Sequence, residues 1–291
     1  MGEKLPPDSA PVTCVILSRG RLEFLIEAIR SAVQQTRSFE RIIISDCTPG
    51  LDGTVNSEFR KKLNEASSGV RVDVIFRDPS NEFADNWAQN LKIIDTPWVV
   101  FFHDDDVFEP EYLDTVSTLQ QGYPDGLVFG VGASIIREDG RTLGSFCKTH
   151  TDRVVNGPVD LVEHYYCAVL TRPAPFPGYC YSTDLLKEVE MPRVGRLSDV
   201  AFLISLVKKT KLVWSCREVM RYRVHESQDT QGIAEKDFVA LFQWIQGEWL
   251  MEQKRARLLG RLAILRSGAR SRLFVGGLRF ALSLCWYRML K

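Results

Sequence analysis

Short apolar runs alternate with segments of helical periodicity along the first third of the chain. In residues 22–33 the apolar positions recur three and four residues apart, which is typical of a helix with one buried face. Residues 81–94 show a similar pattern. The runs between these segments are rich in β-branched and aromatic residues, which favour strands covered on both faces. This alternation predicts an open α/β sheet flanked by helices. The predicted strands are residues 12–17, 41–46, 70–76 and 99–102.

Polar side chains stand at the ends of three of these strands. Ser18 follows the first strand, Asp46 ends the second, and three consecutive acids come soon after the fourth. Ligands of such sheets bind beyond the carboxyl ends of the strands, so we expect these side chains to meet at one edge. The three acids are Asp104, Asp105 and Asp106.

Three adjacent carboxylates repel one another unless a cation lies among them. Mg²⁺ or Mn²⁺ suits such a group, because either ion takes one or two carboxylates together with substrate phosphate oxygens. The alternative is a solvated acidic turn in which Asp104 or Asp106 caps a helix. Because polar groups end several strands at once, the pattern favours a binding site over a simple turn.

The second half of the chain is less regular. Residues 127–136 predict one or two further strands, residues 181–189 a helix, and residues 211–215 a short strand. The prolines of residues 171–178 exclude a helix or a central strand there. That loop either shapes a pocket for a second substrate, with Phe176 exposed or half-buried, or is a plain surface connection.

Two polar residues in this half are candidates for chemistry. Ser198 is expected to be the N-cap of an apolar helix, which places Asp199 in the first turn. Free backbone N–H groups and the helix dipole stabilise a carboxylate at that place, and spacing favours this structural role. The alternative for Asp199 is a general base acting on an acceptor hydroxyl. His225, in a polar segment, is either a metal or phosphate ligand or a solvated side chain.

The charge of the chain is balanced overall but unevenly distributed. The formal net charge is +0, so nothing in the charge favours a nucleic-acid partner. Residues 254–291 contain ten lysines and arginines and no acid. The apolar stretch within this tail is short and has a central arginine, which disfavours a spanning helix and favours binding to an anionic membrane surface. A helical pair packed on the domain, or a face for a coiled-coil partner, is the alternative.

The cysteines and the first residues indicate a compartment. The seven cysteines are odd in number and never spaced as Cys-x-x-Cys, so we expect neither a disulfide framework nor a zinc site. Residues 1–11 lack the apolar core of a signal peptide. We therefore expect a cytoplasmic protein, with the tail holding it peripherally on the inner face of the membrane.

Taken in order, the motifs resemble those of the family 2 glycosyltransferases of the GT-A fold. The resemblance covers about residues 12–230. It implies a Rossmann-like GT-A domain over residues 1–230, with a mostly parallel central sheet, and a helical, basic and amphipathic extension over residues 231–291. The matching segments are residues 12–21, 29–36, 42–46, 86–90, 103–106 and 222–225, the last followed by Ser227 and Gln228.

The resemblance also implies a role for each matching residue. The chain departs from the family pattern at Cys47, where a second aspartate is common, at His103, which is often acidic, and at Gln89, where some relatives have arginine. The implied nucleotide-sugar ligands are Ser18, Asp46, Asn86 and Asp104, the implied ligands of Mg²⁺ or Mn²⁺ are Asp105, Asp106 and His225, and the implied catalytic base is Asp199.

A protein with these residues is expected to transfer a sugar, with inversion, from a nucleotide-sugar donor to a hydroxyl group. The implied acceptor is a lipid-linked glycan, in the synthesis of a bacterial surface polysaccharide such as O-antigen or capsule. One alternative is a nucleotidyltransferase with a related acidic metal site, although residues 18–21 are short for its phosphate loop. The other alternative is a nucleotide-sugar-binding protein without catalysis.

Overall fold

A computed structural model describes residues 10–49, 57–67, 70–146, 151–158, 160–161, 174–226 and 235–248. By their internal contacts the residues form two compact units. The first unit consists of residues 1–154, 174–188 and 211–224, and contains the sheet. The second consists of residues 155–173, 189–210 and 225–291.

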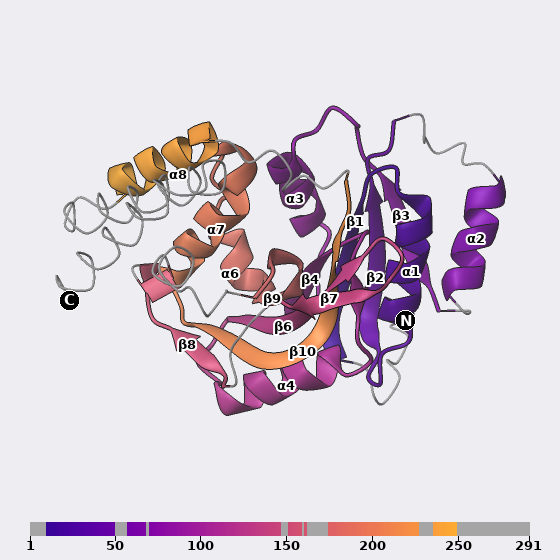
Figure 1. Cartoon of the computed structure of the whole chain (residues 1–291), viewed down its shortest axis with the longest axis horizontal. Coiled ribbons are helices and arrows are strands. Elements are labelled where there is room, and N and C mark those ends of the chain that lie inside the picture. Colours follow the sequence, from indigo (N-terminus) through magenta and orange to yellow (C-terminus); the bar gives the residue numbers. More distant parts are fainter. Residues whose placement is uncertain are drawn as a thin grey trace. The chain divides into compact units, whose positions relative to one another are not determined.

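The four predicted strands of the first unit are present and lie parallel in the order β3-β2-β1-β4 (Figure 1). The helices predicted over residues 22–33 and 81–94 are also present, the second with its ends shifted by a few residues. This alternation confirms the predicted α/β class. The elements are β1 (Ala10–Ser18), α1 (Leu22–Val33), β2 (Phe39–Asp46), α2 (Ser57–Ser67), β3 (Val72–Phe76), α3 (Phe83–Leu91) and β4 (Trp98–His103).

Beyond β4 the sheet becomes mixed. Strand β9 (Tyr179–Ser182) pairs antiparallel with both β4 and β6 (Val128–Arg137), and β10 (Leu212–Val224) runs parallel to β6. The short strand expected at residues 211–215 is therefore far longer than predicted, and the helix expected at 181–189 is shortened to α6 (Thr183–Lys187). The remaining elements of this part are β5 (Val107–Phe108), α4 (Tyr112–Gly122), β7 (Thr142–Ser145), β8 (Arg153–Val155) and the 3₁₀ turn η1 (Phe176–Gly178).

Alternate residues of the central strands face opposite sides of the sheet, and each side is covered by helices. On one side Cys14, Ile44 and Phe102 form a core with buried residues of α1, α2 and α4. On the other side Trp87 of α3 stacks on Phe101, with ring centroids 3.6 Å apart. Because the central strands are buried on both faces, they read in the sequence as continuous apolar runs.

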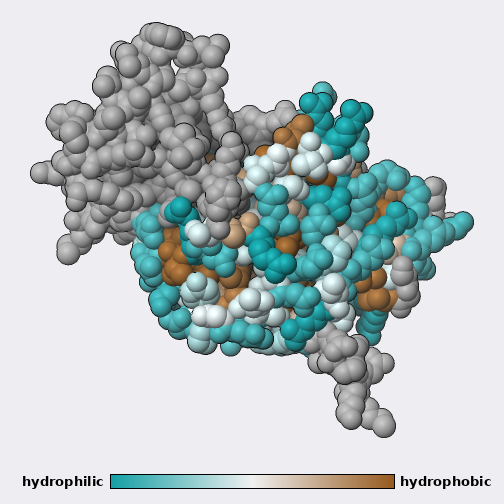
Figure 2. All heavy atoms as spheres, turned by 60° about the horizontal axis from the view of Figure 1, so that its bottom comes forward, coloured by the Kyte–Doolittle hydropathy of each residue, from teal (hydrophilic) through white to brown (hydrophobic). Residues whose placement is uncertain are grey.

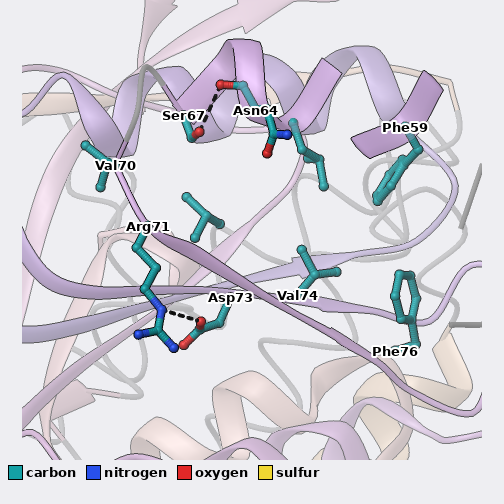
Figure 3. Close-up of a pocket in the computed structure, with 10 residues that line it drawn as sticks. Phe59, Asn64, Ser67, Val70, Arg71, Asp73, Val74 and Phe76 are labelled. Atoms are coloured by element: carbon teal, nitrogen blue, oxygen red, sulfur yellow. Dashed lines mark hydrogen bonds and ion pairs between the residues drawn. The ribbon is translucent and has the colours of Figure 1, made fainter. Parts of the chain in front are cut away.

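The edge strand β3 and helix α2 enclose a pocket of about 450 Å³ (Figure 3). Phe59 of α2 and Val74 and Phe76 of β3 contribute its apolar walls. None of the residues predicted to bind substrate or metal lines this pocket. Ser18, Asp46 and His103 lie instead at the carboxyl ends of β1, β2 and β4.

The second unit contains a 3₁₀ turn η2 (Gly195–Leu197), helix α7 (Ser198–Val207) and helix α8 (Glu235–Glu248). Helix α7 is almost entirely apolar after its first turn, and most of its side chains are buried. The basic tail, residues 254–291, lies outside the described residues.

On the face that Figure 2 shows, the surface of the described residues is mostly hydrophilic, with hydrophobic patches of limited extent. The large apolar side chains exposed among them are Val70, Phe83 and Leu143. Within the described part of the chain, no helix has the length and apolar character needed to cross a bilayer.

Candidate active site

The carboxyl ends of the central strands bring the predicted polar residues to one edge. Ser18 at the end of β1 pairs in register with Asp46 at the end of β2, and Leu17 pairs with His103 at the end of β4. The three acids begin at the next residue, and the backbone N–H of Asp104 donates to Leu17 O at 3.1 Å. Parallel strands therefore place Ser18, Asp46 and the acidic loop, residues 104–106, at the same edge of the sheet.

The acidic loop is buried rather than solvated. Asp104 is 0%, Asp105 6% and Asp106 1% exposed. Burial raises the pKa of Asp104, against the lowering effect of the Arg21 guanidinium. Burial, together with the neighbouring Asp105, raises the pKa of Asp106 well above its ordinary value. These buried carboxylates exclude the solvated acidic turn that the sequence had left open.

The turn after β1 provides cationic and N–H partners for the loop. Gly20 has a positive φ of 78°, a conformation that glycine adopts at little cost, and it directs the chain back toward β4. The backbone N–H of Arg19 donates to Asp104 Oδ2 at 3.0 Å. The Arg21 guanidinium contacts Asp104 Oδ1 at 2.5 Å and Asp105 Oδ2 at 3.0 Å. Arg21 therefore bridges two of the three carboxylates.

A second arginine holds the loop from the opposite direction. Arg223, on β10, is 1% exposed, and its backbone N–H donates to Asp106 Oδ1 at 2.9 Å. Its side-chain Nε donates to the carbonyl oxygen of Asp105 at 2.8 Å. Nη1 donates to the carbonyl oxygens of residues 137 and 138, and Nη2 pairs with Glu27 of α1. Arg223 thus fixes the backbone of the acidic loop to β10.

The donor atoms at this edge fit a divalent cation. One ligand atom from each of His103, Asp105 and Asp106 lies within 4.8 Å of the others. The second carboxylate oxygen of Asp106, Oδ2, is buried and has no hydrogen-bond partner among the described residues. A buried carboxylate oxygen without a partner is costly, and a cation among these oxygens would remove that cost. The carboxylate oxygens of this group are the ligand type that suits Mg²⁺ or Mn²⁺.

His103 was not among the predicted metal ligands, although its position directly before the acids marks it. His225, which was predicted, lies in the second unit directly after β10 and is 5% exposed. Its role as a metal ligand stays a prediction. Its partners in the sequence motif, Ser227 and Gln228, lie outside the described residues.

The residues predicted to bind the nucleoside are buried and hydrogen-bonded to their neighbours. Asp46 Oδ1 accepts the backbone N–H of Thr48 at 2.8 Å, which shapes the turn after β2. Ser18 O accepts the backbone N–H of Cys47 at 3.0 Å, which joins the turns after β1 and β2. Asn86 Oδ1 accepts from the side chain of Asn81 at 3.1 Å. These contacts give each residue a structural role, and their contact with a nucleoside stays a prediction.

Asp199 lies in the first turn of α7, as predicted, and is partly buried. Its Oδ1 accepts the backbone N–H of Val200 at 2.8 Å, and burial raises its pKa to about 6. The expected N-cap was wrong, because the cap position is Leu197 and Ser198 is the first helical residue. Ser198 Oγ instead donates to Gly195 O at 2.8 Å and accepts from Val194 N, which ties η2 to the helix.

Two phenylalanines near the acidic loop differ in exposure. The prediction that Phe176 is exposed or half-buried was wrong, whereas Phe83 reaches the surface. Phe176 is 7% exposed, because η1 turns it in among Trp87, Tyr181 and Phe83. Phe83 is 39% exposed, and its ring centroid lies 6.4 Å from that of His103. Phe83 therefore forms an apolar surface beside the acidic loop.

Comparison with protein families gives a match over most of the first unit. Residues 13–174 match the model of the family described as Glycosyl transferase family 2. This range contains most of β1, all of β2 to β4, the acidic loop and β6. The search of curated proteins finds no match for the chain.

Solved structures with a similar fold include several of S. aureus TarS. TarS residues 1–349 in complex with UDP-GlcNAc gives a TM-score of 0.64 at 14% identity, with 95% of this chain and 80% of that chain covered. TarS residues 1–349 in complex with UDP gives 0.56 at 16% identity, covering 93% and 74%. A further crystal structure of S. aureus TarS gives a TM-score of 0.56 at 16% identity, with 85% of this chain and 42% of that chain covered. This likeness, together with the family match, confirms the predicted GT-A fold.

Proposed function

Because the chain belongs to glycosyl transferase family 2, we propose that it transfers a sugar from a nucleotide-sugar donor to an acceptor hydroxyl, with inversion and with a divalent cation. The observation that carries this proposal is the acidic loop at the carboxyl edge of the parallel sheet, where Asp106 has a buried carboxylate oxygen without a partner among the described residues. A solvated turn would not need that burial, whereas a site for a cation and a diphosphate would.

The residues at this edge divide into two groups in the proposed reaction. Asp105 and Asp106, with His103 or His225, would hold Mg²⁺ or Mn²⁺, and the bound ion would stabilise the negative charge of the leaving diphosphate. Asp104 would bind the ribose. Ser18, Asp46 and Asn86 would line the nucleoside site, and their hydrogen bonds to neighbouring turns support them as a rigid surface for binding.

Asp199 is our proposed general base. A general base must be ionised at the working pH and must also bind the proton of the acceptor hydroxyl strongly enough to remove it. A pKa near neutrality meets both conditions best. Burial brings the pKa of Asp199 to about 6, close to that condition. With the base on the face opposite the leaving diphosphate, the deprotonated acceptor oxygen would form its bond to the anomeric carbon from that face while the carbon–oxygen bond to the diphosphate breaks. A single displacement of this kind inverts the anomeric configuration.

The acceptor and the place of action are proposed from the tail. Its ten basic residues would bring the enzyme to an anionic membrane surface, where lipid-linked glycans are available as acceptors. We propose that the cytoplasmic face of the membrane is that surface and that the product is a cell-surface polysaccharide, such as O-antigen. The TarS complexes contain UDP-GlcNAc and UDP, so UDP-sugars are the first donors to test.

The test is hydrolysis of a panel of nucleotide sugars by the purified chain with Mn²⁺. We expect release of one nucleoside diphosphate, loss of that release in EDTA, and, by NMR, a sugar whose anomeric configuration is inverted. Asp106→Asn should lower the rate at least about a hundredfold, since it removes charge from the proposed metal site. Asp125→Asn is the matched control, because that aspartate pairs with Lys211 on the surface and its side chain is 63% exposed.

Each alternative would give a distinct result. Formation of nucleotide sugars from nucleoside triphosphates and sugar phosphates, with pyrophosphate released, would identify a nucleotidyltransferase. Binding of nucleotide sugars without turnover on any acceptor would identify a binding protein. Retention of configuration in the released sugar would refute the single displacement.

A further inference from the structure

Arg21 occupies the position at which the acidic loop needs positive charge. One guanidinium nitrogen lies 2.5 Å from Asp104 Oδ1 and the other lies 3.0 Å from Asp105 Oδ2. Asp104 and Asp105 are 0% and 8% exposed at the side chain, whereas Arg21 is 24% exposed. The carboxylates are thus fixed within the protein, and the arginine reaches them from the solvent side.

The same carboxylate, Asp105, belongs to the group of donor atoms that fits a metal. Its ligand atom lies within 4.8 Å of those of His103 and Asp106, so an ion at this group would sit close to the Arg21 guanidinium. A guanidinium and a divalent cation repel each other, and burial reduces the screening of that repulsion by water. Simultaneous binding of the Arg21 guanidinium and a divalent cation to Asp105 is therefore unfavourable.

Arg21 is also able to leave without unfolding the loop. The loop backbone is held separately by Arg223, through Asp105 O and Asp106 Oδ1, and Asp104 keeps the N–H of Arg19. The turn at Gly20 places Arg21 at the N-cap of α1, where its side chain makes no capping hydrogen bond. Movement of this one side chain would expose Asp105 to an incoming ion.

We propose that Arg21 is a built-in counter-cation of the acidic loop, which competes with the divalent cation for Asp105. This inference rests on the proposed function, because it assumes that the loop binds a metal. In the absence of donor, Arg21 neutralises the loop and weakens metal binding. When a metal takes Asp105, the guanidinium is released toward the solvent side, where the oxygens of a donor diphosphate are suitable partners for it.

The test is a titration of the purified full chain with Mn²⁺ alone, with free Mn²⁺ measured by electron paramagnetic resonance at fixed ionic strength. Arg21→Gln and Arg21→Met both remove the positive charge. We expect each to lower the Kd for Mn²⁺ by about tenfold relative to the unchanged chain, since a charge beside the ion is lost. Thermal melting establishes that each variant is folded.

Arg19→Gln is the matched control, because it removes the same charge two residues away. The Arg19 side chain is exposed and donates to the carbonyl oxygen of Pro79 at 3.3 Å rather than to the acids. Its Kd for Mn²⁺ should stay within about twofold of the unchanged chain. Arg21→Lys retains the charge and should change the Kd by less than about threefold, which keeps the proposal testable if the neutral variants fail to fold.

The possible results separate this inference from the proposed function. Equal or weaker Mn²⁺ binding by folded Arg21→Gln and Arg21→Met would overturn the competition and leave the metal site standing. A tenfold change in Arg21→Lys would assign the effect to guanidinium geometry and would also overturn it. Absence of Mn²⁺ binding by every variant, the unchanged chain included, would refute the metal site and this inference with it.

Discussion

Single side chains set the charge balance of the acidic loop. Arg21 bridges Asp104 and Asp105, and Arg223 binds the backbone and a carboxylate of the same loop. Arg21 lies 84 positions and Arg223 118 positions from Asp105, so no local pattern connects them to the acids. The sequence places Arg21 in a polar turn and Arg223 in a motif that resembles the family pattern, and neither position indicates a contact with the acids.

Asp199→Asn should separate the chemical step from donor binding. An amide cannot accept the acceptor proton, so we expect the rate to fall at least about a hundredfold while the Kd of the donor changes less than about twofold. In the unchanged chain the rate should rise with pH through about 6 and then level, because the base must lose its proton. A pH–rate profile and isothermal titration measure both effects.

Asp184→Asn is the control for this substitution, because that aspartate is an acid of α6 with a 94% exposed side chain. The pH dependence of the folding stability gives an independent test of the raised pKa of Asp199. The folded pKa of about 6 lies above the ordinary 3.8, so the ionised carboxylate of Asp199 costs stability, and this cost appears as the pH rises from about 4 to about 6. Asp199→Asn should therefore raise Tm at pH 7.5 more than at pH 4. Near-normal turnover in the variant would remove Asp199 from the role of base.

Among the elements, strand β10 departs most from its prediction, and its irregular register explains why. Trp214 of β10 pairs with Gly130 of β6, and the next pair is Glu218 with Gly132. Strand β10 therefore has more residues between these two pairs than β6 has. The extra residues form an outward bend, which Asp152 holds by accepting the N–H of Cys216 at 2.9 Å. Beyond this bend the strand resumes and carries Arg223 to the acidic loop. The polar residues of the bend interrupt the apolar run, so the sequence predicts only the first part of the strand.

Gly132→Ala tests the close packing at this bend. A Cβ at Gly132 would lie 2.8 Å from the carbonyl oxygen of Arg217 and 3.0 Å from that of Cys216, and backbone atoms cannot rotate away as a side chain can. We expect a loss of about 2 kcal/mol in the free energy of unfolding, measured by urea titration. Gly122→Ala, at the end of α4 with no atom within 4 Å of the added Cβ, should be neutral or stabilising. A loss below about 0.5 kcal/mol at Gly132 would show that β10 shifts to accommodate the methyl group.

For the molecule as a whole, the uneven distribution of charge bears on the proposed binding to a membrane surface. Residues 254–291 carry ten basic residues and no acid, while the complete chain has a net charge of +0. The remainder of the chain is therefore net acidic and would be repelled by an anionic surface. The tail is therefore the part of the chain whose net charge favours such a surface.

Deletion of residues 254–291 should release the chain from anionic vesicles. Each basic residue close to an anionic surface contributes about 1 kcal/mol, and salt weakens the attraction. We expect the full chain to sediment with vesicles containing phosphatidylglycerol, less so at high salt, and the shortened chain to stay in the supernatant. Vesicles of phosphatidylcholine are the control. Equal sedimentation of the two chains would exclude the tail as the membrane-binding segment.

The order of amino acids alone predicts the first half of the sheet, its helices and the edge at which the polar residues meet. These features depend on local patterns: buried strands need continuous apolar runs, helices need apolar residues three and four apart, and parallel strands align their carboxyl ends. Contacts between distant residues could not be predicted in this way. Three features depend on how β1, β4 and β10 pack together: the burial of Asp104 to Asp106, the arginine contacts with them, and the inclusion of His103 in the group of donor atoms that could hold a metal. The electrostatic environment and the solvent exposure of a site depend on residues that are neighbours in space. The local pattern along the chain does not show which residues those are.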